Sequence, residues 1–131
     1  MNSYNENKRV YIAGMISGLT REQYTAQFRL AENLLRERGY RVCNPTSFFI
    51  SRHERLYNFF GYTLTLLYDL WQLSRCDLIY KIPGWRDSRG ANIESCFAYH
   101  YRIYPIPFEE RSKMDKRMAK WQEKHLKVTK S

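Results

Sequence analysis

The chain has 131 residues and a net charge of +9. This length is enough for one domain with a hydrophobic core of its own. Hydrophobic residues make up 44% and aromatic residues 16%, which excludes an intrinsically disordered protein. No apolar stretch is long enough to span a bilayer, and the polar start lacks the apolar core of a signal peptide. The three cysteines have no C-x-x-C spacing, so we expect a cytoplasmic protein with reduced thiols and with neither a metal nor a cofactor.

Strand and helix patterns alternate from the start of the chain. Residues 9–13 form an apolar run that predicts a buried strand. A helix is expected from Thr20, a favourable N-cap residue, to Gly39, which would close it. Residues 40–43 then predict a short second strand.

The second half of the chain continues this alternation. It predicts a helix over 56–73 that is irregular near Gly61, a strand over 77–82, a helix over 90–100, an edge strand over 102–106 and a helix over the last twenty residues. The alternation predicts one α/β domain of Rossmann or flavodoxin type. Its parallel sheet of four or five strands would be the middle of three layers.

The positive charge is concentrated at the C-terminus. Residues 111–131 hold eight Lys or Arg and two acidic residues, a net of +6, which leaves +3 for residues 1–110. We therefore predict a globular domain over 1–110 and a basic helical tail over 111–131. Met114, Met118 and Trp121 on one face of the tail favour packing on the domain or across a dimer, and nucleic-acid binding by the tail is the less favoured alternative.

The segment Asp87–Glu94, which reads DSRGANIE, carries the most chemical information. It follows a predicted buried strand and turn and leads into a helix, so it combines a strand end with the first helical turn. Open parallel sheets bind small molecules at such strand ends. Glu94 would lie in that first turn, where the helix start keeps a carboxylate ionised, with Ser88 and Arg89 beside it.

Two other loops should meet this segment at the carboxyl edge of the sheet. Gly14–Gly18 follows the first strand, and Asn44–Thr46 follows the second. The glycines and Ser17 of the first loop suit a phosphate or a sugar hydroxyl against exposed amides. A tight connection also needs glycine for steric reasons alone, and this loop has neither P-loop nor G-x-G-x-x-G spacing.

Five segments of the chain follow one another in a set order and spacing: Val10–Gly14, Arg38–Tyr40, Asn44–Pro45, Cys76–Asp77 and Pro83–Glu94. Together they resemble the nucleoside 2-deoxyribosyltransferase superfamily, in particular its small phage and bacterial branch of uncharacterised proteins. The resemblance covers residues 9–107. It implies a small-molecule nucleotide or nucleoside substrate, and a homodimer or larger assembly, because neighbouring subunits complete the related active sites.

The resemblance also implies three catalytic residues. Glu94, four residues after Gly90, matches the family's nucleophile, which attacks the anomeric carbon of a nucleoside and forms a glycosyl-enzyme. Tyr11 matches a tyrosine that hydrogen-bonds this nucleophile. Asp77 matches an aspartate that protonates or positions the leaving base. A carboxylate is a competent nucleophile for an oxocarbenium-like carbon, and a departing base needs a proton.

Ser88 indicates the substrate. At this position, six residues before the nucleophile, deoxyribosyltransferases have an Asp that binds the sugar 5′-hydroxyl, whereas the related 2′-deoxynucleoside 5′-phosphate N-hydrolases have a Ser that contacts the 5′-phosphate. A carboxylate would repel a phosphate that a hydroxyl and an arginine accept. We therefore expect a (deoxy)nucleoside 5′-monophosphate, bound by a set of seven residues: Gly14, Ser17, Asn44, Trp85, Ser88, Arg89 and Gly90.

Each assignment has a simpler structural alternative. Glu94 could be an acidic residue that favours a helix start, Asp77 a polar residue at a strand start, and Tyr11 a core residue. Ser88 could be a turn hydroxyl, and Trp85 could cover the edge of the core instead of stacking on a base. For the whole chain, the alternatives are a non-catalytic nucleotide-binding or sensor protein and a nucleic-acid-associated protein that acts through its tail.

Overall fold

The computed structural model describes residues 5, 7–16, 18–46 and 66–126. Four parallel strands form one sheet in these ranges: β1 (Arg9–Ala13), β2 (Arg41–Cys43), β3 (Leu78–Lys81) and β4 (Tyr104–Pro105). The helices are α2 (Arg21–Glu37), α4 (Arg89–His100) and α5 (Phe108–His125), with a short 3-10 helix η1 (Trp85–Asp87). Residues 66–73 are also helical. The irregularity predicted near Gly61 lies outside the described residues.

The strand order across the sheet is β2-β1-β3-β4. All neighbouring strands are parallel. From β1 the chain crosses through α2 to β2 at one edge, and it later returns past β1 to β3 and β4. This is the flavodoxin-like order, whose direction reverses between β1 and β3. The predicted α/β sandwich is therefore confirmed, with four strands in its sheet.

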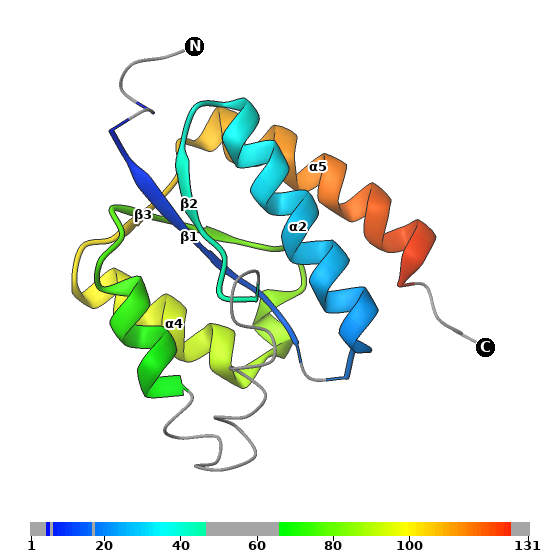
Figure 1. Ribbon diagram of the computed structural model, residues 1–131, viewed down its shortest axis with the longest axis horizontal. Coiled ribbons are helices and arrows are strands. Elements are labelled where there is room, and N and C mark those ends of the chain that lie inside the picture. Colours follow the sequence, from blue (N-terminus) through cyan, green and yellow to red (C-terminus); the bar gives the residue numbers. More distant parts are fainter. Residues whose placement is uncertain (1–4, 6, 17, 47–65, 127–131) are drawn as a thin grey trace.

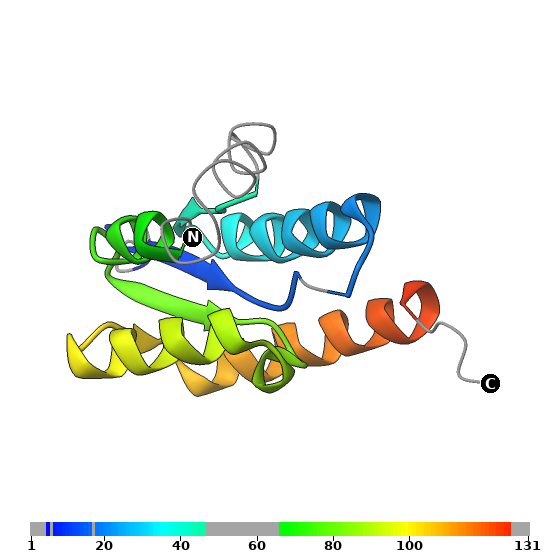
Figure 2. The same cartoon turned by 90° about the horizontal axis from the view of Figure 1, so that it is seen from below.

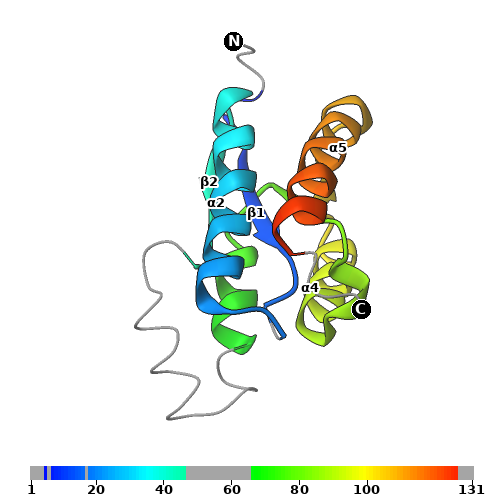
Figure 3. The ribbon, with the colours of Figure 1, turned by 90° about the vertical axis from the view of Figure 1, so that its right-hand side faces the viewer.

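Helices cover both faces of the sheet (Figure 1). Figure 3 shows α2 and α5 side by side on one face, and α4 and the helix over 66–73 lie on the other. Successive side chains of a strand point to opposite faces. In β1, Val10 and Ile12 therefore enter the α2–α5 layer, whereas Tyr11 and Ala13 enter the layer of α4.

Figure 2 shows how these helices divide along the sheet. The helix over 66–73 and α2 lie on the β2 side, whereas α4 and α5 lie on the β4 side.

The ends of α2 are set by local chemistry. Thr20 Oγ1 accepts a hydrogen bond from the Gln23 backbone N–H, and the Gln23 side chain accepts one from the Thr20 N–H, both at 3.0 Å. This reciprocal pair is a capping box. At the other end, Gly39 has φ +91°, a left-handed conformation that favours glycine and stops the helix. The limits predicted from Thr20 and Gly39 are confirmed.

The basic C-terminal helix is part of the core. Met114 and Met118 are fully buried against α2 and the sheet. Gln122 donates to the Gln27 side chain at 2.7 Å and to the Pro83 carbonyl at 2.9 Å. The packing predicted for the methionine stripe is confirmed, and a domain boundary at residue 110 would fall inside α5.

Two elements differ from the prediction in their extent. The fourth strand is only Tyr104–Pro105 instead of 102–106, because Arg102 has φ +61° in the turn after α4 and Pro105 has no N–H to continue a ladder. Helix α4 begins at Arg89, so Glu94 lies in its second turn and not in its first. In the described parts of the chain, we find no helix with the length and apolar character needed to cross a membrane.

Candidate functional site

A buried hydrogen bond joins β1 to α4. The Tyr11 hydroxyl donates to Glu94 Oε2 at 2.8 Å, and the two residues are 0% and 7% exposed. Helix α4 presents Ala91, Glu94 and Ala98 to the sheet, at helical spacing. Because the two alanines are small, the helix lies close enough for Glu94 to reach the phenol. The structure thus brings together two of the three predicted catalytic residues.

Burial is the main influence on the charge of Glu94. Burial, and after it the charge of Asp69, raises the pKa of Glu94 from 4.5 to about 8, although the hydrogen bond from Tyr11 lowers it. The pKa of Tyr11 is raised well above its usual value, first by burial and then by the charge of Glu94, so the phenol stays a donor. The expectation that the helix start keeps Glu94 ionised is therefore wrong, because the dipole effect fades beyond the first turn.

Asp69 is a candidate site residue that was not predicted from the sequence. It lies in the helix over 66–73, its charge raises the pKa of both Tyr11 and Glu94, and its Oδ1 is buried. A signal for it does exist in the sequence. Asp69 is the single acidic residue in the stretch Leu66–Leu73, which is otherwise mostly apolar. Acidic residues are rarely buried unless they are paired, so a carboxylate in such a helix indicates a specific role.

Asp77 lies away from this group. It directly precedes β3, and its Oδ2 accepts a hydrogen bond from the backbone N–H of Arg9 at 2.9 Å. Parallel strands begin at the same edge of a sheet, so Asp77 lies at the edge opposite the loops that follow the strands. This contact ties two strand starts together, as in the simpler alternative for Asp77, and the structure does not bring this carboxylate to Tyr11 and Glu94.

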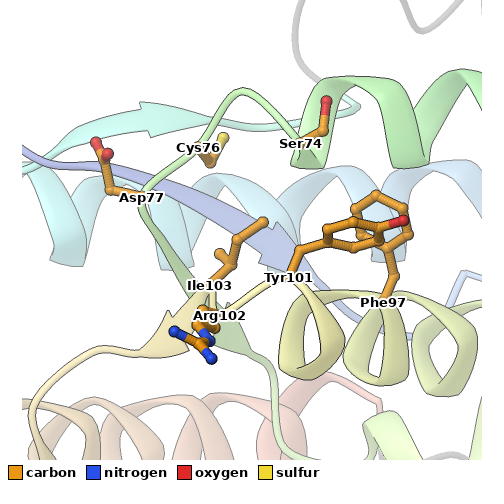
Figure 4. A pocket seen from close by; sticks show the side chains of 7 residues that line it. All are labelled: Ser74, Cys76, Asp77, Phe97, Tyr101, Arg102 and Ile103. Atoms are coloured by element: carbon orange, nitrogen blue, oxygen red, sulfur yellow. The ribbon is translucent and has the colours of Figure 1, made fainter.

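A pocket of about 550 Å³ opens beside Asp77 (Figure 4). It lies between the amino end of β3 and the turn after α4, and its lining consists of Ser74, Cys76, Asp77, Phe97, Tyr101, Arg102 and Ile103. Glu94 and Tyr11 are not part of this lining. The pocket is therefore separate from the candidate site.

The loop after β1 meets the loop after β3 beside Gly14. The Ile82 N–H donates to the Ala13 carbonyl at 2.8 Å, just beyond the ends of β1 and β3. A Cβ on Gly14 would lie 3.0 Å from Ile82 Cδ1 and 3.3 Å from Phe28 Cζ. The close packing of these side chains therefore explains why glycine occupies this position. Ser17 lies outside the described residues.

Asn44 anchors the loop after β2. Its Nδ2 donates to Glu32 Oε1 at 3.1 Å, and its Oδ1 accepts from the N–H and the hydroxyl of Thr46 at 2.9 and 2.8 Å. The side chain is 7% exposed. These contacts hold the loop in shape, and a substrate contact by Asn44 stays a prediction.

Ser88, Arg89 and Gly90 form the start of α4. Ser88 is the N-cap, and its Oγ accepts a hydrogen bond from the Ala91 N–H at 3.1 Å. Arg89, the first helical residue, is exposed, and Gly90 is half-buried in the first turn. The serine thus caps the helix. Its contact with a phosphate stays a prediction.

Trp85 lies in η1, close to two cations. Lys81 Nζ is 4.4 Å and Arg86 Cζ 4.7 Å from the centroid of the indole ring. These cation–π contacts compete with the stacking on a base that was predicted for Trp85.

The family model described as "Domain of unknown function (DUF4406)" matches residues 8–104 of the chain. The chain belongs to the DUF4406 family. The matched region contains Tyr11, Asp69 and Glu94 and ends before α5. No match was found among curated proteins or among solved structures.

The candidate site of this DUF4406 protein is a pair of carboxyl groups with a phenol. Among the described residues, no group of three or more His, Cys, Asp or Glu side chains could hold a metal ion. Glu94 has a raised pKa, a fixed hydrogen-bond donor in Tyr11 and a second carboxylate nearby in Asp69. Such a group can supply a nucleophile and an acid–base residue, the two requirements of glycosidic bond cleavage.

Proposed function

We propose that this protein is an N-glycosidase or a deoxyribosyltransferase-like enzyme. Its substrate would be a (deoxy)nucleoside 5′-monophosphate, whose N-glycosidic bond breaks on attack by Glu94. The observation that carries this proposal is the buried 2.8 Å hydrogen bond between Tyr11 and Glu94, with the charge of Asp69 close by. The resemblance of the loop motifs to nucleoside 2-deoxyribosyltransferases supports the choice of substrate.

The position of the pair in the fold also supports an active site. Ligands of open parallel sheets bind outside the carboxyl ends of the strands, at the point where the strand order reverses. In this protein that point lies between β1 and β3. Tyr11 belongs to β1, and Glu94 belongs to the helix that directly follows the loop after β3.

In the proposed reaction, Glu94 Oε1 forms a bond to C1′ of the sugar while the C1′–N bond breaks and its electron pair leaves with the base. Tyr11 holds Oε2 and leaves Oε1 for the attack. The sugar carbon becomes positively charged in the transition state, so the ionised form of Glu94 stabilises it more than the protonated form does. Water or a second base then displaces Glu94 from C1′.

Asp69 takes the acid–base role that the resemblance implied for Asp77. A leaving base needs a proton, and glycosidases commonly pair a carboxylate nucleophile with a second carboxyl group. Asp69 would donate this proton to the base and later take one from the attacking water.

A non-catalytic nucleotide-binding protein is the second candidate. The raised pKa of Glu94 favours it, since with a pKa of about 8 roughly a tenth of this carboxyl group is ionised at pH 7. The two candidates differ in a simple way, because only the enzyme releases free base.

The test is base release from a panel of nucleoside 5′-monophosphates and nucleosides, measured by chromatography. We expect the wild type to release base from at least one monophosphate, with a rate that rises between pH 6 and pH 9 as Glu94 ionises. Glu94→Gln and Asp69→Asn should each lower the rate by at least about a hundredfold.

Asp77→Asn is the matched control, because it makes the same chemical change in a carboxylate outside the proposed site. It should keep most of the wild-type rate. Binding of nucleotides without base release by the wild type at any pH would contradict the enzyme and support the binding protein. Loss of activity in Asp77→Asn with activity retained in Asp69→Asn would reverse the roles of the two aspartates.

A further inference from the structure

Two cations lie against the ring of Trp85, and a third, Arg111, lies over the ring of Phe108, 5.4 Å from its centroid. Lys81 Nζ and Arg86 Cζ lie 4.4 and 4.7 Å from the centroid of the Trp85 ring. Arg111, near the start of α5, is close enough for its charge to lower the pKa of Lys81. Among the described residues, none of the three cations forms an ion pair with a carboxylate.

Lys81 is held in place in this cluster. It is the last residue of β3, and its Nζ donates to Ser95 Oγ at 3.1 Å. Burial, followed by the charges of Arg86 and Arg111, lowers the pKa of this ammonium group, and only Cys96 acts in the opposite direction. A partly buried cation beside two others is unfavourable by itself, and a bound anion would remove this cost.

Two acidic residues close to Arg111 on α5, Glu110 and Asp115, are engaged elsewhere. The Glu110 carboxylate accepts hydrogen bonds from Tyr40 and from Asn5, which is at 3.2 Å. Asp115, one helical turn beyond Arg111, accepts from the Tyr80 hydroxyl at 2.7 Å. The positive charge beside Trp85 is therefore not compensated by these side chains of the same helix.

The cluster is separate from the candidate catalytic pair. Glu94 and Ser95 are consecutive residues of α4, so their side chains diverge by about 100° around the helix axis. Glu94 contacts Tyr11 of β1, whereas Ser95 contacts Lys81 at the end of β3. A ligand held by this cluster therefore does not depend on catalysis by Glu94.

We propose that Lys81, Arg86 and Arg111 form a binding site for a phosphate group, completed by the Ser95 hydroxyl. Two guanidinium groups offer forked donors that match phosphate oxygens, and a lysine adds a compact charge. Ser95 accepts from Lys81 and keeps its own O–H to donate to the anion. The ligand is inorganic phosphate or the phosphate of a small phosphorylated molecule.

The test is a titration of the full-length protein with inorganic phosphate at constant ionic strength, with potassium chloride as the reference salt. The Lys81 side chain is followed by NMR. Saturable shifts are expected at Lys81, and its pKa should rise when phosphate is bound. The double variant Arg86→Gln/Arg111→Gln should bind phosphate at least about tenfold more weakly, because it loses two charge-assisted contacts.

The matched control is Lys120→Gln/Lys124→Gln, which removes the same charge from exposed residues of α5. These lysines lie about 14 and 20 Å further along the helix than Arg111. Their loss should change the affinity less than about twofold. Shifts that do not saturate, or equal weakening in both double variants, would overturn the site. Circular dichroism verifies that each variant is folded.

Two further arms separate this site from the proposed reaction and identify the source of the phosphate. Glu94→Gln should bind inorganic phosphate like the wild type even if base release is never observed. Competition by a nucleoside 5′-monophosphate, and not by the nucleoside, would assign the site to the phosphate of a nucleotide. Without such competition, the saturable site belongs to free phosphate or to another phosphorylated ligand.

Discussion

Glu94 combines two properties that oppose each other. Its burial between α4 and the sheet, together with the charge of Asp69, raises the pKa to about 8, which lowers the fraction of ionised nucleophile at neutral pH. The same burial leaves the ionised form poorly solvated and therefore reactive toward a developing positive charge. Tyr11 moderates this conflict, because its hydrogen bond is the one contribution that lowers the pKa of Glu94.

The raised pKa also predicts how stability depends on pH. Below pH 4.5, Glu94 is protonated in both the folded and the unfolded state and has no effect. Between pH 4.5 and about 8 it ionises only in the unfolded state, so the stability of the fold falls as the pH rises. Glu94→Gln should remove this loss and be more stable than the wild type at pH 9, by about 3–5 kcal/mol.

Urea unfolding of both proteins between pH 4 and pH 9 measures this difference. Glu123→Gln, at an exposed position of α5, is the control and should follow the wild type at every pH. If the free energy of unfolding changed with pH in the same way for Glu94→Gln and the wild type, burial would not shift the pKa of this carboxyl group.

At the scale of elements, the start of α4 couples helix stability to substrate recognition. Ser88 caps the helix through the Ala91 N–H, and the same loop would face the monophosphate. Free N–H groups at a helix start attract anions, so one short segment can serve both purposes.

Substitutions of Ser88 can separate these two purposes. Ser88→Ala should lower stability by about 0.5–2 kcal/mol, whereas Ser88→Asp should keep the cap, because Asp is as good an N-cap as Ser. Ser88→Asp adds a negative charge, so it should lower kcat/KM for the monophosphate at least about tenfold and affect the nucleoside little. Thermal unfolding and base-release kinetics measure the two effects. An equal loss on both substrates would remove the reason for preferring nucleotides.

At the scale of the whole molecule, the order of the strands places the site and α5 completes the core. The reversal between β1 and β3 brings segments from distant parts of the chain to one edge of the sheet. On the opposite face from Glu94, α5 packs its methionines against α2, so the basic helix covers apolar surface as well as carrying charge.

Because α5 packs in the core, truncation of its buried side chains should lower the stability of the protein. Met118→Ala should destabilise the protein by about 2–5 kcal/mol, because it leaves a cavity under a fully buried side chain. Met118→Leu, which conserves volume, should cost less than about 1.5 kcal/mol. Chemical denaturation measures the free energy of unfolding of both variants and of the wild type. If Met118→Ala were as stable as the wild type, α5 would not belong to the core in solution.

Local sequence signals were sufficient for much of the fold. The apolar run of β1, the capping residues of α2 and the alternation of strands with helices each depend on residues close together in the chain, and all were predicted. The pairing of Tyr11 with Glu94 was also expected, but only through the resemblance of ordered motifs, since the two residues are 83 positions apart.

What the tertiary structure alone decided concerns distance and burial. Asp69, and not Asp77, lies near Glu94, because a helix packs over the sheet while the start of β3 lies at its opposite edge. The raised pKa of Glu94 and the cations around Trp85 likewise come from side chains that separate elements bring together. Periodicity and capping act over a few residues, whereas desolvation and charge act through space, so the sequence by itself determined the elements and their packing determined the chemistry of the site.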